Sequence, residues 1–416
     1  MMQIREIVMH NRTADMLIVI IHPELWNGGS DRCNVGMIRH FLNTEHRIVW
    51  YTSWSDKYWS KDEFSNVELR ELKLPLHPGD WLSENVAIGW QLLFSDLNPD
   101  LIILDHSASC VPLLKWRFPK VKILFYCHFP QQLVTPSRFF LYRWYANLIG
   151  VYESFLFKDV DTIMVNSKFT KKKFSLVMPE ISKDKIMVVY PPCDVDVTEI
   201  GEKAISRMSR PKNERYTFLS LNRFWPEKRL EIVIEAAVEL KKKNLNPRIL
   251  LAGSVMPTIP ESKIYYTYLK EKVKEFQVSD LVEFVPSPTE YKKFALLREC
   301  DTVLYTPENE HFGIVPIEAL EQRRPVIVCN SGGPAETVLD GITGSKISYP
   351  DGQLLAEEME KHMNKPFWPA LDDDTGFEVQ RKRFDNNFSL KGFGNHLNDA
   401  IAELFSQPRS AMRDRA

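Results

Sequence analysis

The sequence predicts an α/β protein made of two Rossmann-like, doubly wound parallel-sheet domains that face each other across a cleft. Short runs rich in β-branched residues alternate with longer amphipathic stretches in both halves of the chain. Strands that alternate with helices favour parallel sheets joined by right-handed crossovers. Pro191-Pro192-Cys193-Asp194 interrupts this pattern near the middle, and we interpret it as the hinge. With 416 residues, the chain is long enough for two domains of ordinary size.

The predicted strands follow from the apolar runs. In the first half they are residues 17–21, 47–51, 101–104, 121–126, 162–165 and 186–190. In the second half they are residues 217–221, 249–252, 282–285, 302–305, 326–329 and 346–348. We place the domains at residues 1–194 and 195–385, followed by a helical tail, residues 386–416, that packs back on one of them.

The composition excludes several classes of protein. Hydrophobic residues make up 44% of the chain and charged residues 26%, which is typical of a soluble globular protein. The formal net charge of -2 argues against a general nucleic-acid binder. The six cysteines form no C-x-x-C pair, so we expect neither a disulfide framework nor a zinc site. No run of 18 apolar residues occurs, so any membrane contact is expected from the surface.

Two carboxylates follow the predicted strand 302–305. Glu310 lies in a loop before Gly313. Pro316 and Glu318 are expected in the first turn of the helix that follows, and Pro325 stops that helix. The loops at the carboxyl ends of strands form the ligand-binding edge of an open α/β sheet. Carboxylates accept hydrogen bonds from hydroxyl groups and repel phosphate. The pair therefore predicts a polyol ligand whose phosphates are bound by other residues.

Arg223 and Lys228 are the candidates for phosphate binding. They follow the predicted strand 217–221, and a helix is expected to begin near Pro226 and run through Leu240, with Lys228 in its first turn. A cation is unfavourable at a helix N-terminus unless it has another role. Arginine binds phosphate through two parallel hydrogen bonds. A solvated surface lysine is the alternative, and the carboxylates in the same half favour the phosphate site.

Two glycine-rich loops could bring backbone N–H groups close to a phosphate. One contains Gly28 and Gly29 after the first strand, and the other is Asn330-Ser331-Gly332-Gly333-Pro334. Ordinary turns explain both loops nearly as well. Neither is a G-x-G-x-x-G fingerprint, which disfavours a dinucleotide-dependent oxidoreductase.

His128 lies at the C-terminal edge of the predicted strand 121–126, just before Pro130. It is either a structural histidine or a side chain that orients substrate. Asp194-Val195-Asp196 lies in the predicted hinge and Asp372-Asp373-Asp374 in a polar stretch, so we predict no metal site. Residues 138–158 have aromatic and aliphatic residues at helical spacing, which predicts either a core helix or a helix at a membrane surface.

These residues resemble a known family. Glu310 and Glu318 form the E-x7-E motif of retaining family-4 glycosyltransferases of the GT-B fold, Arg223 and Lys228 match that family's phosphate-binding pair, and Gly28-Gly29 matches its glycine loop. Further stretches are similar to the α-1,3/α-1,6-mannosyltransferases of dolichol-linked oligosaccharide assembly; they comprise residues 123–130, 304–307, 310–318 and 330–334. The chain departs from the family pattern at Trp26-Asn27 and at Asp31, where the family often has Glu.

The resemblance implies that residues 1–194 bind the acceptor and residues 195–385 bind the donor, GDP-mannose. The acceptor would be Man-GlcNAc2-diphosphate-dolichol, which would receive an α-1,3 and then an α-1,6 mannose in N-glycan precursor assembly. The reaction would take place at the cytoplasmic face of the endoplasmic reticulum membrane, without cofactor or metal. Peripheral membrane contact and a complex with other early N-glycan mannosyltransferases are also implied.

The resemblance also implies a role for each residue of the site. Arg223 and Lys228 would bind the donor diphosphate, Glu310 the mannose hydroxyls and Glu318 the ribose. His128 would lie near the reacting carbon, and Phe312, Gly313 and Ile314 would face the donor. Two alternatives stay open: a family-4 enzyme for an acceptor without dolichol, and a non-catalytic partner in a glycosylation complex. The intact set of Arg223, Lys228, Glu310 and Glu318 argues against the non-catalytic partner.

Overall fold

The computed structural model describes residues 16–25, 29–44, 46–55, 64, 66–72, 81–134, 150–194, 214–256, 259–365 and 367–406. The chain divides into two compact units. The first unit comprises Met1–Pro192 and Ser389–Ala416, and the second comprises Cys193–Phe388. These boundaries lie two and three residues from the ones expected at 194 and 385.

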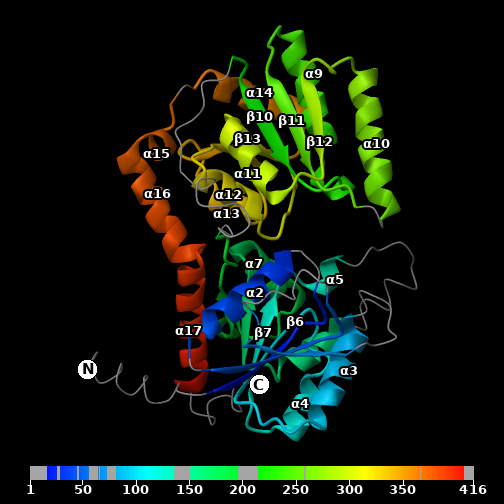
Figure 1. The fold of residues 1–416 in the computed structure, drawn as a ribbon, viewed down its shortest axis with the longest axis vertical. Helices are drawn as coiled ribbons and strands as arrows, with labels where there is room; N and C mark the ends of the chain where they lie inside the picture. Colours follow the sequence, from blue (N-terminus) through cyan, green and yellow to red (C-terminus); the bar gives the residue numbers. More distant parts are fainter. Residues whose placement is uncertain are drawn as a thin grey trace. The chain divides into compact units, whose positions relative to one another are not determined.

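The first unit contains a seven-stranded parallel sheet with the order β5-β3-β1-β6-β7-β8-β9. Two of its strands, β6 and β7, are labelled in Figure 1. Its strands are β1 (Leu17–Ile21), β3 (Arg47–Thr52), β5 (Glu68–Glu71), β6 (Leu101–Asp105), β7 (Lys122–Cys127), β8 (Thr162–Val165) and β9 (Ile186–Val188). A separate pair of short strands joins β2 (Glu24–Leu25) to β4 (Trp54–Ser55). β1 pairs with β3 on one side and with β6 on the other. The strands that follow β1 in the chain are therefore added first on one side of it and then on the other, which makes β1–β6 the switch point of the sheet.

Helices cover both faces of this sheet. One core cluster unites one face with α3 (Trp81–Leu93), α4 (Val111–Arg117), the helix at residues 150–157 and α7 (Lys168–Val177). The other cluster unites the opposite face with α2 (Gly29–Leu42) and α17 (Leu390–Ser406). Two short segments, α5 (Gln131–Val134) and η3 (Lys183–Lys185), complete the described helices of this unit.

Nearly all of the predicted helical tail, residues 386–416, belongs to the first unit, and only residues 386–388 lie in the second. α16 (Asp374–Asn387) lies in the second unit, whereas α17 packs against α2 in the first. Phe393, Leu397 and Ile401 of α17 are buried in the same core cluster as the apolar face of α2. Among the described residues, no helix is long and apolar enough to cross a membrane.

The second unit contains a six-stranded parallel sheet with the order β12-β11-β10-β13-β14-β15. Its strands are β10 (Thr217–Leu221), β11 (Arg248–Gly253), β12 (Val282–Pro286), β13 (Thr302–Tyr305), β14 (Val326–Cys329) and β15 (Gly344–Ile347). Its helices are η5 (Pro226–Lys228), α9 (Glu231–Lys242), α10 (Pro260–Glu275), α11 (Glu290–Glu299), α12 (Ile314–Glu321), α13 (Pro334–Thr337), α14 (Gly352–Met363), α15 (Pro369–Asp372) and α16. The two faces of the sheet bury separate apolar clusters beneath these helices.

Three sequence-based expectations need correction. The helix expected from Pro226 begins only at Glu231, because residues 226–228 form a 3₁₀ turn that Arg229 ends in the left-handed region, with φ of 52°. α12 begins at Ile314, so Glu318 is its fifth residue and lies just beyond the first turn. The edge strand β5 was not predicted, because its sequence Glu-Leu-Arg-Glu has a single apolar residue.

Candidate active site

The predicted phosphate and sugar residues of the second unit meet at the edge where the strand order reverses. Arg223 and Lys228 follow β10, Glu310 and Glu318 follow β13, and these two strands are neighbours at the centre of the sheet. Ligands of open α/β sheets bind outside the carboxyl ends of the strands at such a switch point. The fold therefore places all four residues at the expected binding edge.

Lys228 and Glu310 form an ion pair at this edge. The Tyr305 hydroxyl donates a hydrogen bond of 3.1 Å to the same carboxylate, at Oε2. Burial alone raises the pKa of Glu310, but the charge and hydrogen bond of Lys228 outweigh it and hold the pKa below its usual value. Glu310 is therefore an anion that can accept hydrogen bonds from sugar hydroxyls.

A hydrogen bond from the loop after β13 holds the turn that carries Lys228. The Thr306 hydroxyl donates a hydrogen bond of 2.9 Å to the Lys228 carbonyl oxygen, which links the loop after β13 to the loop after β10. The lysine and glutamate side chains are 14% and 18% exposed, so a ligand can reach both of them. Arg223 is exposed at the end of β10. No described residue forms an ion pair with Arg223, and its guanidinium is available to an anion.

Glu318, for which the resemblance implies contact with ribose, is buried. Its exposed fraction is 5%, and its Oε1 lies 3.0 Å from Nζ of Lys293 on α11. Lys293 also contacts Glu290 at 2.6 Å, so one lysine bridges two carboxylates. The sequence analysis missed Lys293. The only signal was a lysine in the first turn of a helix, the same feature that identified Lys228.

Glycines shape the loop that follows Glu310. Gly313 precedes α12 with φ of 80°, in a region that favours glycine. A Cβ at Gly332 would lie 2.3 Å from the Glu310 carbonyl oxygen, and one at Gly333 would lie 2.4 Å from the Phe312 backbone. The Gly332-Gly333 loop therefore packs against the Glu310 loop, which explains these glycines without an anion. Phe312 is buried, and Ile314 is half-buried at the start of α12.

The first unit has a cluster of polar groups at its own switch point, between β1 and β6. His22 follows β1 and is fully buried. Its Nδ1 lies 2.8 Å from Asp105 Oδ2, and its Nε2 lies 3.0 Å from Asp31 Oδ1. Burial alone lowers the pKa of His22, but the two carboxylates outweigh it and raise the pKa to about 10. His22 is therefore an imidazolium between two carboxylates at neutral pH.

His128 joins this cluster through Asp105. Its Nε2 lies 3.0 Å from Asp105 Oδ2, and Asn34 Nδ2 donates to the same oxygen at 2.7 Å. Although burial raises the pKa of Asp105, the nearby histidines hold it well below its usual value. His128 itself is partly exposed, with 19% of its side chain accessible. His128 is thus the solvent-accessible end of an otherwise buried hydrogen-bond network.

His106 is a further member that the sequence analysis missed. It follows Asp105 with φ of 59°, a strained conformation for a residue with a side chain. Its ring lies 4.4 Å from the Trp81 ring and 5.4 Å from the His128 ring, measured between centroids. Burial, together with the charge of His22, lowers the pKa of His106 to about 3. It is therefore a neutral ring beside the imidazolium.

The donor atoms of His22, Asp105 and His106 lie within 4.8 Å of one another, a spacing that could suit a metal ion. However, both nitrogens of His22 already face carboxylates. A protonated imidazole has no lone pair to offer a metal. His22 and Asp105 therefore belong to a hydrogen-bond network rather than to a metal site.

Two predicted features lie partly or wholly outside the described residues. Gly28 is not described, whereas Gly29 is the exposed first residue of α2. Asp31, at the position where the family often has Glu, points to His22. Of residues 138–158, the structure describes 150–158; Val151, Tyr152 and Phe155 are exposed there, whereas Leu156 and Phe157 are buried in the core.

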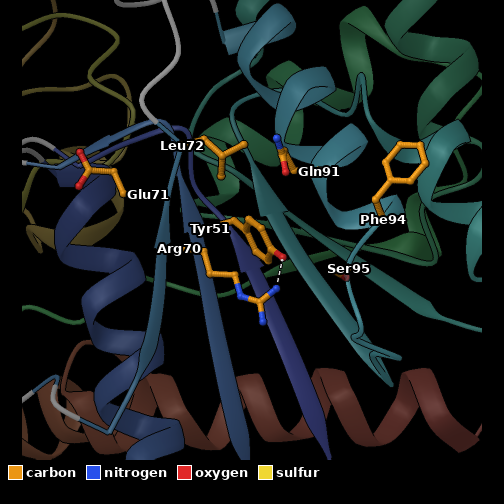
Figure 2. A pocket seen from close by; sticks show the side chains of 7 residues that line it. All are labelled: Tyr51, Arg70, Glu71, Leu72, Gln91, Phe94 and Ser95. Carbon is orange, nitrogen blue, oxygen red and sulfur yellow. Dashed lines mark hydrogen bonds between the residues drawn. The ribbon is translucent and has the colours of Figure 1, made fainter.

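The first unit also has a cavity of about 550 Å³ away from these residues (Figure 2). Its lining comprises Tyr51, Arg70, Glu71, Leu72, Gln91, Phe94 and Ser95. The Arg70 guanidinium donates to the Tyr51 hydroxyl at 2.8 Å and to Glu68, as the dashed line to Tyr51 shows. None of the predicted site residues lines this cavity. The Arg70 guanidinium is bonded to side chains of β3 and β5, so it is not available to a ligand.

Comparisons with known proteins agree with this geometry. Residues 27–197 match the family model "Glycosyltransferase Family 4", and residues 202–380 match "Glycosyl transferases group 1". Among solved structures, a glycosyltransferase from Rickettsia africae covers 95% of this chain and all of its own at 17% identity, with a TM-score of 0.74. A sucrose-phosphate synthase from Thermosynechococcus elongatus covers 94% of this chain and 99% of its own at 16% identity, with a TM-score of 0.72. These structures show the two-domain GT-B fold.

Two curated relatives are more similar in sequence. Alpha-1,3/1,6-mannosyltransferase ALG2 of Homo sapiens is 30% identical and covers 93% of this chain and 96% of its own. The protein of the same name from Kluyveromyces lactis is 32% identical and covers 94% of this chain and 86% of its own. The chain therefore belongs to the ALG2 family of glycosyltransferases.

Proposed function

We propose that the protein is a retaining mannosyltransferase that uses GDP-mannose as donor and Man-GlcNAc2-diphosphate-dolichol as acceptor. It adds an α-1,3 and then an α-1,6 mannose during assembly of the N-glycan precursor. The observation that carries the proposal is the Lys228–Glu310 pair at the switch point of the second unit. It places a phosphate-binding cation beside a sugar-binding anion in a chain that is 30% identical to a mannosyltransferase.

Different side chains of the second unit bind different parts of the donor. Exposed Arg223 and half-buried Lys228 bind the diphosphate, because both are cations at the strand ends. Glu310 accepts hydrogen bonds from mannose hydroxyls, since Lys228 and Tyr305 keep its carboxylate ionised and oriented. Glu318, held by Lys293, accepts from the ribose hydroxyls. The Phe312-Gly313-Ile314 backbone lines the sugar side.

The reaction retains configuration through attack on the same face of the sugar. The bond from the anomeric carbon to the diphosphate oxygen breaks, and its electron pair stays on the departing GDP. The acceptor hydroxyl oxygen forms the new bond to that carbon, and a phosphate oxygen takes the hydroxyl proton. Negative charge grows on the diphosphate as the bond breaks, so Arg223 and Lys228 stabilise the transition state more than the ground state. We propose that this step uses neither a metal ion nor a cofactor.

We further propose that the enzyme acts at the cytoplasmic face of the endoplasmic reticulum through peripheral contact of the first unit. α3, α4 and the helix at 150–157 bury residues in one core cluster, so they cover the same face of the sheet. Their outer surfaces expose large apolar residues, namely Trp90, Phe94, Trp116, Val151, Tyr152 and Phe155. Arg117, Lys120 and Lys158 are exposed on or next to the same helices. Aromatic residues flanked by cations suit the headgroup layer of an anionic bilayer.

Vesicle flotation tests this surface. We expect the protein to float with vesicles that contain phosphatidylserine, and the Trp116→Ser, Phe155→Ser double variant to float less. The matched control replaces Ile264 and Val379 by Ser, since both are exposed apolar residues of the second unit. Equal flotation of the two double variants would contradict this surface. A complex with other early N-glycan mannosyltransferases is a further proposal, which copurification from membranes would test.

Mass spectrometry of a synthetic acceptor tests the reaction itself. Purified protein, GDP-mannose and liposomes are incubated with Man-GlcNAc2-diphosphate-lipid. A gain of two hexoses, absent in Glu310→Gln, is the expected result. A gain of one hexose would assign a single linkage. If the acceptor stays unchanged while GDP-mannose binds, an acceptor without dolichol or a missing partner becomes the better proposal. With neither transfer nor binding, the proposed function falls.

A further inference from the structure

The groups around Asp105 come from four separate parts of the first unit. His22 follows β1, Asn34 lies on α2, Asp105 ends β6 and His128 follows β7. Three of them place a nitrogen within 3.0 Å of Asp105 Oδ2, and those nitrogens are His22 Nδ1, Asn34 Nδ2 and His128 Nε2. The Asp105 side chain is 2% exposed. Its charge and orientation are therefore set by its neighbours rather than by water.

We propose that Asp105 is a positioning residue for the transfer reaction, which keeps His128 in the tautomer protonated at Nε2 and presents its Nδ1 as an acceptor to a sugar hydroxyl. The proposal rests on the function proposed above and extends it to groups that do not touch substrate. His22, Asn34 and Asp31 are the supports that hold Asp105 in place.

The tautomer follows from the hydrogen-bond partners. A carboxylate oxygen only accepts, so the His128 nitrogen that faces Asp105 must carry a proton. In a neutral ring the other nitrogen, Nδ1, then has a free lone pair. Among the described residues, none bonds to this Nδ1, and the ring is partly exposed. His128 therefore presents an acceptor at the ligand-binding edge of the sheet.

His22 and Asp31 give the network its rigidity. Asp105 would be costly to bury as a lone anion, and the imidazolium of His22 offsets that cost. His22 is in turn held by Asp31 at its other nitrogen. The Asn166 side chain donates to the His128 backbone carbonyl at 2.7 Å, which fixes the residue from its main chain as well. These contacts come from α2, from the end of β6 and from the loops that follow β1, β7 and β8.

The position of the network supports a role in function rather than in folding alone. The cluster lies where the strand order reverses between β1 and β6, the place where open α/β sheets bind ligands. His106 adds a strained backbone conformation at the same point. A structural ion pair of this unit lies at the opposite ends of the strands instead, where Asp161 accepts from Lys115 and from the Ile123 backbone.

The test compares Asp105→Asn with Asp161→Asn, which removes a structural carboxylate of the same sheet. For each variant, kcat and KM are measured with GDP-mannose and the synthetic lipid-diphosphate acceptor. We expect kcat to fall by about 10- to 100-fold in Asp105→Asn, by analogy with the loss of a carboxylate that orients a metal-bound histidine. Asp161→Asn should lower stability while kcat stays near the wild-type value. Equal kcat in the two variants would overturn the proposal.

A spectroscopic measurement follows the tautomer directly. Protein labelled with ¹⁵N-histidine should show His128 protonated at Nε2 alone and His22 protonated at both nitrogens near pH 7. In Asp105→Asn, we expect His128 to populate both tautomers and His22 to lose a proton. A wild-type spectrum with His128 protonated at Nδ1 would overturn the proposal whatever the kinetics show. If the wild-type protein transfers no mannose, the proposed function falls, but the spectrum still decides whether Asp105 sets the tautomer.

A second pair of variants covers the case in which Asp105→Asn does not fold. Asn34→Ala removes one of the three donors to Asp105 Oδ2 and should lower kcat in the same direction by a smaller factor. His362→Gln is its control, because His362 is a buried histidine of the second unit that bonds Thr302 and Ser345. An Asn34→Ala enzyme with wild-type kcat and an unchanged His128 spectrum would also contradict the proposal.

Discussion

The two sheets carry charged side chains at the same topological position but bond them in opposite ways. In the first unit, His22 at the β1–β6 switch point is fully buried, and both ring nitrogens face carboxylates. In the second unit, Lys228 and Glu310 at the β10–β13 switch point are partly exposed and bond mainly to each other. The first arrangement is a fixed support, whereas the second can exchange its partners for a ligand.

Burial explains the difference. A buried ion pair cannot give up a partner without leaving a charge in a medium of low polarity, which is strongly unfavourable. A pair near the surface contributes less to stability, and water or a ligand can replace either partner at small cost. The same fold therefore uses one switch point to hold a histidine in place and the other to bind a charged donor.

Removal of the Glu310 charge is the strongest way to break the second arrangement. Glu310→Gln keeps the size of the side chain, but it removes the anion that pairs with Lys228 and accepts from sugar hydroxyls. We expect kcat/KM for GDP-mannose to fall by roughly 10²- to 10³-fold, as for loss of a preorganised electrostatic group. Glu308→Gln is the control, since Glu308 is exposed on the same loop. Similar activity of the two variants would show that Glu310 has no special role.

The pH dependence of stability tests the first arrangement. The pKa of His22 rises from 6.5 to about 10 on folding, so its contribution is complete below pH 6.5 and is lost as the pH rises through about 10. The free energy of unfolding should fall in that window by up to about 1.4 kcal/mol per pH unit. Urea unfolding of the wild-type protein and His22→Gln measures it. The gap between the two proteins should shrink as the pH rises, and a constant gap would contradict the buried imidazolium.

Alanine substitutions at two glycines distinguish the effect of backbone strain from that of a steric contact with the Glu310 loop. Gly332 and Gly341 have nearly equal φ of 70° and 71°, but only the Gly332 position would bring a Cβ against Glu310, at 2.3 Å from its carbonyl oxygen. Either change to Ala introduces strain of about 1 to 2 kcal/mol. Gly332→Ala should in addition weaken GDP-mannose binding several-fold, because the Glu310 loop must move. Calorimetric titration decides this, and equal affinities would show that the loop adapts freely.

Much of the fold is predictable because apolar runs report buried strands. β1, β8, β10, β13 and β14 have the predicted limits, since each is a short, mainly apolar run bounded by polar residues or turns. β5 was not predicted, because an edge strand needs little apolar surface. Its Glu-Leu-Arg-Glu sequence lacks a clear alternation of apolar and polar residues. The 3₁₀ turn at residues 226–228 was not predicted, because Pro226 suits the start of an α-helix as well as that of a 3₁₀ helix.

The two sites were predictable to different degrees. The spacing of Glu310 and Glu318 is local, so one stretch of sequence reveals it. The network around Asp105 joins residues far apart, such as His22, which is 83 positions away, and only the strand order brings them together. A carboxylate at the end of the apolar run 101–104 was the available signal for Asp105. Lys293 likewise became visible only through its contact with Glu318, 25 positions away.

The most direct test of the account measures chemistry and donor binding separately in Lys228→Ala. Single-turnover mannose transfer at saturating GDP-mannose gives the rate of the chemical step, and calorimetric titration gives the Kd for the donor. Lys263→Ala, an exposed lysine of α10, is the control. We expect the single-turnover rate to fall by about 10²- to 10³-fold with a much smaller change in Kd, because Lys228 meets the charge that develops on the leaving diphosphate. An unchanged rate with a Kd weakened by that factor would contradict the account.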